Sequence, residues 1–285
     1  MLVMVGYDRV ILLVRRYSIV ARINLLIPEH AYIFGFLQAD GNAYRRRNHI
    51  TIKIELSSRD GCILERIADI LNVPHTISHR RRSTNFIVNH ESVSLTIRDQ
   101  SLCRELLELG LPVGCKSKVI APPVVMFSEP DYYRGLIDGD GSVGVIASGN
   151  PFISLTTDSD DIASSYLKMV NTISPGTRTS RRNVRDDIYN IVVRGVAAQS
   201  IVRYLYYPEC LALKRKVSHV SNMLLWAPKT RVYIKKPKKD IVMPRWTPEE
   251  DMYILSHTID EAEHHLNRTY YGIRNRRLRL LRYSA

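Results

Sequence analysis

The sequence predicts an α+β fold of two pseudo-symmetric halves followed by a small all-α C-terminal domain, and three observations lead to that prediction. The segment YIFGFLQADG at residues 32–41 is matched without a gap by YYRGLIDGDG at residues 132–141. A similar order of hydrophobic patterns follows each copy, which indicates a duplicated domain. Beyond Leu225 a basic, proline-containing stretch precedes a new helical pattern that begins at Thr247.

Hydrophobic periodicity predicts the elements of each half. Residues 49–56 alternate between apolar and polar side chains, with Ile50, Ile52 and Ile54 on one face, as expected of a half-buried strand. The remaining patterns give each half the order helix, two strands, helix, two strands, helix, or αββαββα. The further predicted segments are, in the first half, helices over 59–71 and 102–109 with strand alternation at 93–97, and, in the second half, strands over 143–147, 152–156 and 189–193, a helix capped near 158–161 and a helix over 197–206.

Changes in composition set the predicted domain boundaries. The two halves are expected over residues 30–125 and 126–227, and a helical module over residues 246–285. Residues 228–245 are rich in Lys, Arg and Pro, which is typical of a linker. Residues 1–29 form an extension to which the sequence assigns no role.

The charge balance favours a nucleic-acid partner. The chain carries 41 Lys and Arg against 28 Asp and Glu, a net charge of +13 that is typical of proteins with a polyphosphate partner. No apolar run approaches the roughly 20 residues needed to span a bilayer, so we expect a soluble, intracellular protein with no membrane partner. The four cysteines include no CxxC pair, which argues against a zinc site or a disulfide framework.

Small residues form a stripe along each repeated segment. Gly35 and Ala39 lie four residues apart in the first copy, as Gly135 and Gly139 do in the second, so each pair shares one helix face. Missing side chains let two backbones approach closely. We therefore expect the two helices to pack against each other along these stripes, although the same pattern would also suit tight core packing without any function.

An aspartate closes each of these helices. If the stripes face each other, Asp40 and Asp140 lie at neighbouring helix ends, and Gly41 and Gly141 are expected to supply the left-handed turn that ends each helix. Negative charge is disfavoured at a helix C-terminus, so a cation is needed, and Mg²⁺ suits two carboxylates plus phosphate oxygens. An ordinary Asp–Gly turn is the alternative, but its occurrence twice behind matching helices favours the functional interpretation.

These segments resemble a known family. GFLQADG at 35–41 and GLIDGDG at 135–141 resemble the two LAGLIDADG motifs of the single-chain homing endonucleases, and the likeness spans about residues 31–225. The resemblance implies a monomer with saddle-shaped antiparallel sheets that makes a site-specific double-strand cut in DNA, and a gene associated with intron or intein mobility. The earlier acidic position of the motif, occupied by Gln38 and Asp138, is not the one the resemblance assigns to the metal.

The resemblance also implies residue roles at the site. It assigns Asp40 and Asp140 as catalytic residues that bind a divalent metal, with the backbone of Ala39 and Gly139 as further candidate ligands. The metal would activate a water and polarise the phosphate during hydrolysis of the phosphodiester.

A basic residue near each scissile phosphate is implied as well. The candidates are Lys116 or Lys118 in the first half and Lys214 or Lys216 in the second, and Lys116 and Lys214 match best by spacing. Such a lysine would stabilise developing phosphate charge or organise the attacking water. The alternative is that these lysines are exposed or make ordinary phosphate contacts.

The polar faces of the predicted strands are the candidates for DNA recognition, because an antiparallel ribbon fits the major groove. Outside such a protein, a polar strand face is more often simply solvated. The candidate residues are Arg45, Arg47, His49, Thr51 and Lys53 in the first half and Ser154, Thr156, Arg181, Arg182, Asn190 and Arg194 in the second.

The C-terminal segment resembles a Myb/SANT-like helix-turn-helix module. The likeness rests on RWTPEEDMYIL at 245–255 and on the RT-x4-R pattern that begins at Arg268. Thr247 and Glu250 predict a capping box at the start of the first of three helices. The last helix offers Arg274, Arg276 and Arg277 as DNA-binding residues, whereas the alternative is a solvated basic helix packed on the catalytic domain.

A protein with the same fold could instead have a function of another class. The chain would then be a binding protein, either an RNA-splicing maturase with intron RNA as its partner or a DNA-binding regulator that does not cut. The presence of both motif aspartates favours the endonuclease. A structural or membrane-peripheral role would leave the duplicated Asp–Gly helix ends unexplained.

Overall fold

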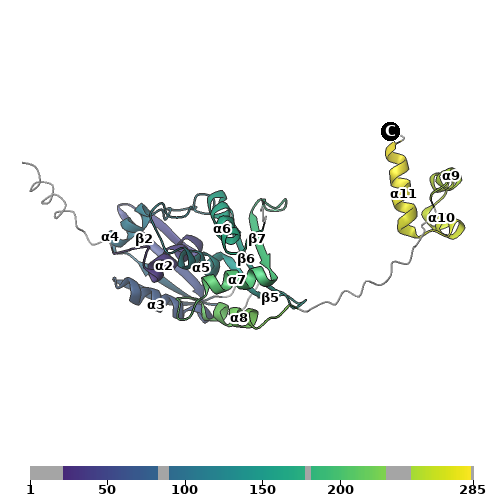
Figure 1. Cartoon of the computed structure of the whole chain (residues 1–285). Coiled ribbons are helices and arrows are strands. Elements are labelled where there is room, and N and C mark those ends of the chain that lie inside the picture. Colours follow the sequence, from purple (N-terminus) through teal and green to yellow (C-terminus); the bar gives the residue numbers. More distant parts are fainter. Residues whose placement is uncertain (1–21, 83–89, 177–180, 229–244, 284–285) are drawn as a thin grey trace, which may run out of the picture. The chain divides into compact units, whose positions relative to one another are not determined.

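The computed structural model describes residues 22–82, 90–176, 181–228 and 245–283 (Figure 1). Contacts divide the chain into two compact units, with the boundary between residues 229 and 230. Most of the predicted extension and of the predicted linker lies outside the described residues. Within the described ranges, no helix combines the length and the apolar character needed to cross a membrane.

The first half has the predicted order of elements. Its strands form one antiparallel sheet in the order β1-β2-β4-β3, and Ile50, Ile52 and Ile54 of β2 are buried as the alternation predicts. Its elements are α2 (Pro28–Asp40), β1 (Gly41–Arg46), β2 (His49–Ser57), the 3-10 helix η1 (Ser58–Asp60), α3 (Cys62–Leu71), β3 (His75–Arg82), β4 (His90–Ile97) and α4 (Gln100–Glu108).

The second half has one strand fewer than predicted over the residues that are described. Its antiparallel sheet has the order β5-β6-β7. Residues 181–188, where strand structure was expected, form turns, because the Asn183 side chain accepts hydrogen bonds from the backbone N–H groups of Arg185 and Asp186. The elements are α5 (Glu129–Asp140), β5 (Gly141–Val145), β6 (Pro151–Thr157), α6 (Asp160–Ile173), β7 (Tyr189–Arg194), α7 (Gly195–Leu205) and α8 (Lys214–Leu224).

Helices α2 and α5 lie side by side along their small residues, as the sequence predicts (Figure 1). A Cβ atom on Gly35 would lie 2.2 Å from the carbonyl oxygen of Tyr132, and one on Gly135 would lie 2.2 Å from that of Tyr32. Backbone atoms cannot yield as a flexible side chain can. The glycines are therefore required for this helix contact.

Each of these helices runs directly into a strand, and the predicted left-handed turns are wrong. Gly41 has φ −74° and Gly141 has φ −103°, so both backbones are extended. The need for glycine is steric instead, because a Cβ atom would lie 2.5 Å from the Leu37 carbonyl oxygen at Gly41 and 2.7 Å from the Ser154 carbonyl oxygen at Gly141.

The described end of the N-terminal extension belongs to the core of the first unit. Ile23 and Leu25 are buried, and the Ile23 N–H donates to Glu105 Oε1 over 2.9 Å. The Ser128 N–H donates to the Leu25 carbonyl oxygen over 2.7 Å, just ahead of α5. This short segment thus contacts both halves.

The described residues of the second unit form three helices, α9 (Pro248–Ser256), α10 (Ile259–Leu266) and α11 (Tyr270–Tyr283). The capping box predicted at Thr247 and Glu250 is confirmed, and a second one joins Thr258 and Glu261 at the start of α10. The fully buried apolar core is small, comprising Ile254, Ala262 and Ile273.

Candidate active site

Asp40 and Asp140 lie at neighbouring helix ends, as the sequence predicts. A Cβ atom on Gly139 would lie 3.4 Å from the backbone nitrogen of Asp40, which brings the last turns of α2 and α5 together. Partial burial, and then the charge of Asp40, raises the pKa of Asp140 to about 6. Burial also raises the pKa of Asp40. Two carboxylates that repel each other in this way would gain from a cation between them.

Lysine amines occupy the C-terminal ends of both helices. Lys116 Nζ donates to the carbonyl oxygens of Leu37, at 3.1 Å, and Ala39. These carbonyls lie in the last turn, where helix partners are missing and the dipole is negative. Negative charge at the end of α2 was expected to need a cation, and the Lys116 ammonium supplies part of that positive charge.

In the second half the equivalent amine belongs to Lys216, not to Lys214. Lys216 Nζ donates to the carbonyl oxygens of Ile137, Asp138 (2.9 Å) and Gly141 (3.0 Å), whereas Lys214 is exposed at the first position of α8. The preference for Lys214 is therefore corrected.

A sequence signal for Lys216 exists, although spacing from the motif misses it. Lys216 shares the buried face of α8 with Val220 and Met223, four and seven residues further on. A lysine on an otherwise apolar helix stripe is unusual unless its amine has partners. The spacing of Lys216, Val220 and Met223 along one helix face would thus have identified Lys216 as the buried lysine.

Burial lowers the pKa of both amines to about 8, against the opposing pull of the aspartates. At neutral pH both lysines thus remain mainly protonated. The site contains two cations and two anions that are partly withdrawn from water.

A cavity of about 390 Å³ opens beside Asp140 and Lys116. Its size lies within the range of about 300–1,000 Å³ that is usual for ligand pockets. Its lining mixes polar and apolar surface and comprises Gln38, Ala39, Lys116, Ser117, Ile120, Asp140, Thr156, Thr157, Asp158 and Ile188.

The donor set fits a hard divalent cation with few protein ligands. Over the residues described, no cluster of three or more His, Cys, Asp or Glu side chains is present. Mg²⁺ is commonly held by one or two carboxylates, with water and substrate phosphate completing its coordination. Asp40 and Asp140 match that requirement, and the Ala39 carbonyl, proposed as a further ligand, already accepts a bond from Lys116.

The exposed face of the first sheet carries part of the predicted recognition set. Arg45, Arg47 and His49 are exposed, but Arg45 pairs with the buried Ile50 and so lies on the core-facing side of β1, and Arg47 lies in the turn after that strand. Thr51 is only 8% exposed, and Lys53 Nζ is paired with Glu55 Oε2 at 2.7 Å. Thr51 and Lys53 therefore present less free surface than the alternation alone predicts, and their contact with DNA stays a prediction.

Sequence reasoning missed two arginines on this sheet. Arg80 of β3 and Arg98, just after β4, are exposed and line a cavity of about 420 Å³. Its other lining residues are Tyr44, Lys53, Glu55, Ser78, His79, Ser94 and Thr96. Strand pairing brings these residues together, so only the sheet order reveals them.

In the second half, Asn190 and Arg194 are exposed on β7, opposite Thr156 and Phe152 of β6. Both therefore lie on the solvent face, as predicted. Ser154 and Thr156 are half-buried on the neighbouring strand, and Arg181 is exposed but lies outside any strand.

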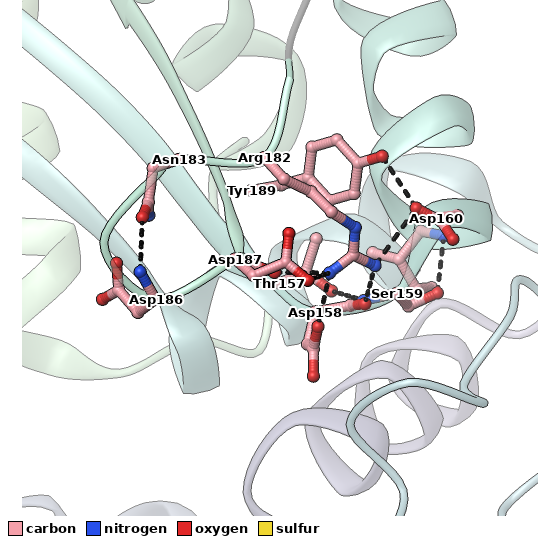
Figure 2. A network of polar contacts seen from close by, with 10 residues as sticks. Thr157, Asp158, Ser159, Asp160, Arg182, Asn183, Asp186, Asp187 and Tyr189 are labelled. Carbon is pink, nitrogen blue, oxygen red and sulfur yellow. Dashed lines mark hydrogen bonds and ion pairs between the residues drawn. The ribbon is translucent and has the colours of Figure 1, made fainter.

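Arg182 does not lie on a strand, and its guanidinium is engaged within the protein (Figure 2). It donates to Asp158 Oδ1 at 2.7 Å and to Asp160 Oδ1 at 3.1 Å, and it lies 4.9 Å from the ring centroid of Tyr189. Arg182 thus ties residues 181–188 to the start of α6, and its contact with DNA stays a prediction.

Two of the three arginines predicted to bind DNA in the second unit bond to other residues of that unit. Arg276 forms a two-bond ion pair with Asp251 of α9, at 2.7 and 2.6 Å, and Arg277 donates to the His257 carbonyl oxygen. Arg274 is exposed on another face of α11, together with Tyr271. Arg276 and Arg277 thus support the packing of the helices, and their contact with DNA stays a prediction.

Comparison with known proteins identifies part of this architecture. Residues 131–205 match the family model described as a LAGLIDADG-like domain, which includes Asp140 but not the first half. No curated protein matches the chain.

Solved structures that are similar to the chain include two homing endonucleases. One, I-WcaI bound to its DNA recognition sequence, is 12% identical with a TM-score of 0.48, over 76% of this chain and 95% of that one. The other, the LAGLIDADG homing endonuclease I-SmaMI bound to cleaved DNA, is 14% identical with a TM-score of 0.44, over 69% and 87%. I-SmaMI bound to uncleaved DNA in the presence of calcium ions is 13% identical with a TM-score of 0.41, over 64% and 85%.

Proposed function

We propose that the chain is a site-specific endonuclease that hydrolyses one phosphodiester in each strand of double-stranded DNA with a divalent metal, Mg²⁺. The observation that carries the proposal is the meeting of Asp40 and Asp140 at two helix ends, with Lys116 and Lys216 bound to the carbonyls beside them. The two pseudo-symmetric halves would each serve one strand.

The chain's own residues divide the chemistry between them. Asp40 and Asp140 would hold the metal, which when bound acts as a Lewis acid and lowers the pKa of a coordinated water. The protonated amines of Lys116 and Lys216 would stabilise negative charge on the phosphate in a partly dry site.

The two sheets would lie on the DNA, because antiparallel ribbons fit the major groove. Arg80 and Arg98 are exposed cations on the outer face of the first sheet, and Asn190 and Arg194 are exposed polar residues of β7. The net charge of +13 supports such a partner. A monomer of this kind would cut both strands without a second copy.

We infer that the second unit is a Myb/SANT-like helix-turn-helix module that adds DNA contacts through α11. Tethering two binding units raises the effective concentration of the second after the first has bound. Arg274→Ala should weaken DNA binding while leaving the unit folded, whereas Arg276→Ala should lower its stability because Asp251 loses its partner. Equal loss of stability in both variants would contradict this division.

The decisive experiment selects the target and the activity together. The protein is incubated with a randomised duplex library and Mg²⁺, and the cut ends are sequenced; EDTA should abolish cutting. Asp40→Asn and Asp140→Asn should lose cleavage of the selected target but still bind it. If both variants cut as well as the parent, the proposed mechanism is wrong.

Binding without cleavage would instead support the rival function, a DNA-binding regulator or a maturase that acts on intron RNA. A splicing assay separates these two if the gene lies inside an intron. The position of the gene inside an intron, an intein or between genes also tests the proposed role in intron or intein mobility.

A further inference from the structure

The residues two positions before the helix-ending aspartates, Gln38 and Asp138, are polar but fully buried, with 0% and 1% of their surfaces exposed. A buried polar side chain is costly unless its hydrogen bonds are satisfied. Their partners therefore show what these two residues do. All of those partners lie in the other long helix or in the segments that carry the site lysines.

Gln38 holds both ends of the segment that carries Lys116. Its Nε2 group donates to the carbonyl oxygen of Ala121 at 2.9 Å and to that of Gly110 at 3.3 Å. Lys116 lies between these two anchor points. The segment itself is irregular, so it depends on such bonds for its shape.

Asp138 holds the segment that leads into Lys216, but as a hydrogen-bond acceptor, whereas Gln38 holds its segment as a donor. Its carboxylate accepts from the backbone N–H of Leu213 at 2.7 Å, immediately before α8, and from Tyr206 Oη at 2.7 Å, at the end of α7. The start of α8, and with it Lys216, is thereby fixed against α5.

A tyrosine of the opposite helix completes each contact. Tyr132 Oη of α5 donates to Gln38 Oε1 at 2.6 Å, and Tyr32 Oη of α2 donates to Asp138 Oδ2 at 2.8 Å. Each anchor thus belongs to a network that crosses the contact between the helices. Charge-assisted and networked bonds of this kind hold geometry better than isolated ones.

We propose that Gln38 and Asp138 are positioning residues, each of which fixes the lysine of its own half against the end of its helix. The proposal rests on the proposed function for its catalytic consequence. The polarity differs between the halves: Gln38 donates to carbonyls of the lysine segment, whereas Asp138 accepts from its N–H. Removing the hydrogen bonds of Gln38 or of Asp138 should therefore displace the lysine of that half alone.

Gln38→Glu breaks the first anchor with little change of shape. A carboxylate cannot donate to the carbonyls of Gly110 and Ala121, and a protonated one could donate to only one of them, while the bond from Tyr132 is kept. Gln199→Glu is the matched control, since Gln199 is also buried and donates to the two carbonyls of Met223 and Trp226 at 2.8 Å.

The first test needs neither DNA nor metal. The full chain is treated with a dilute amine-acetylating reagent, and the labelling rate of each lysine is read by mass spectrometry. Gln38→Glu should raise the rate at Lys116 severalfold and leave Lys216 and the exposed Lys214 at parent rates. Gln199→Glu should leave Lys116 unchanged. Equal rises at all sites, or no rise at Lys116, would overturn the proposal.

The second half is tested with two substitutions at Asp138. Asp138→Leu removes the acceptor and should expose Lys216 to the reagent, whereas Asp138→Asn can still accept from Leu213 through its amide oxygen and should label near the parent rate. If Asp138→Leu does not fold, Gln38→Glu still decides the matter in the first half.

Strand-resolved cleavage then tests the consequence for the reaction. With each strand of the target labelled differently, Gln38→Glu and Asp138→Leu should each slow one cut on the order of tenfold, in opposite strands, because small misplacements of reacting groups are costly. Equal slowing of both strands would indicate a merely structural role and overturn the proposal. If the parent cuts no DNA, the proposed function fails, and selective labelling still decides whether the anchors exist.

Discussion

The two sheets of the first unit have similar frameworks but expose different chemistry. The outer side of β1-β2-β4-β3 presents the cations Arg80 and Arg98. On the outer side of β5-β6-β7, Val192 is exposed and Phe152 half-buried beside polar residues. The two halves thus resemble each other at the contact between α2 and α5, and they differ on the outer faces of their sheets. Under the proposed function, the first sheet is suited to phosphate contacts, and the second, which exposes Arg194 beside Val192, is suited also to apolar and hydrogen-bonding contacts with base edges.

The largest expected effect tests whether the lysines of the two halves are equivalent. Lys216→Met should lower the cleavage rate of the selected target by about 10²- to 10³-fold, through loss of a positive charge that stabilises the reacting phosphate, and Lys116→Met should do the same. Lys214→Met is the control and should cut at a rate close to that of the parent, because its side chain is exposed. A large loss in Lys214→Met with none in Lys216→Met would reverse the assignment made from the buried contacts of Lys216.

The next effect concerns the part that both halves share. Gly35→Ala and Gly135→Ala should each destabilise the first unit by about 1–3 kcal/mol, since the new methyl group would meet a backbone oxygen at 2.2 Å. Thermal or urea unfolding measures this. Gly144→Ala is the comparison, because its methyl group would meet the Phe152 ring at an ordinary 3.5 Å. Unequal effects of the two helix glycines would show that the halves contribute differently to this contact.

A smaller effect tests the difference between the two sheets. Arg80→Ala and Arg98→Ala should each reduce the slope of log affinity against log salt by about 1, as expected for loss of one phosphate contact. Asn190→Ala in the second sheet should weaken binding to the selected target without changing that slope. Binding titrations at several salt concentrations provide the measurement, and a slope change for Asn190→Ala would contradict the comparison.

The features that the sequence predicted correctly are those whose pattern lies within a single helix or strand. The alternation of residues 49–56 and the small-residue stripes are local patterns, and the buried face of β2 and the contact of α2 with α5 follow from them. The capping box at Thr247 is local too. These features were predicted correctly because each requires only the regular period of one helix or strand.

The features that were missed depend on contacts distant in sequence. Whether Lys214 or Lys216 reaches the site depends on how α8 packs against the end of α5. Arg182 appeared free because its partner Asp158 is 24 residues away. The extended backbone of Gly41 reflects a direct continuation into β1 that the motif alone does not specify.

The smallest expected effect compares the caps of one helix from each half. Asp99 caps α4 by accepting from the Leu102 N–H at 2.8 Å, whereas the neutral hydroxyl of Ser159 caps α6. That hydrogen bond, with the help of Arg22, holds the pKa of Asp99 below its usual value. A carboxylate whose pKa is lowered on folding contributes stability above its unfolded pKa of about 3.9, and this contribution is lost as the pH falls through the folded value.

Hydrogen exchange of the full chain, followed by mass spectrometry, separates the two caps. Asp99→Asn keeps a capping side chain that does not titrate, so the difference in protection of α4 between parent and variant should be present near neutral pH and should vanish in acid. Ser159→Ala should instead weaken α6 by about 1 kcal/mol, by an amount that does not follow the titration of a carboxylate. A constant difference for Asp99→Asn across this range would mean that the charge of Asp99 contributes nothing, and that the two caps work in the same way.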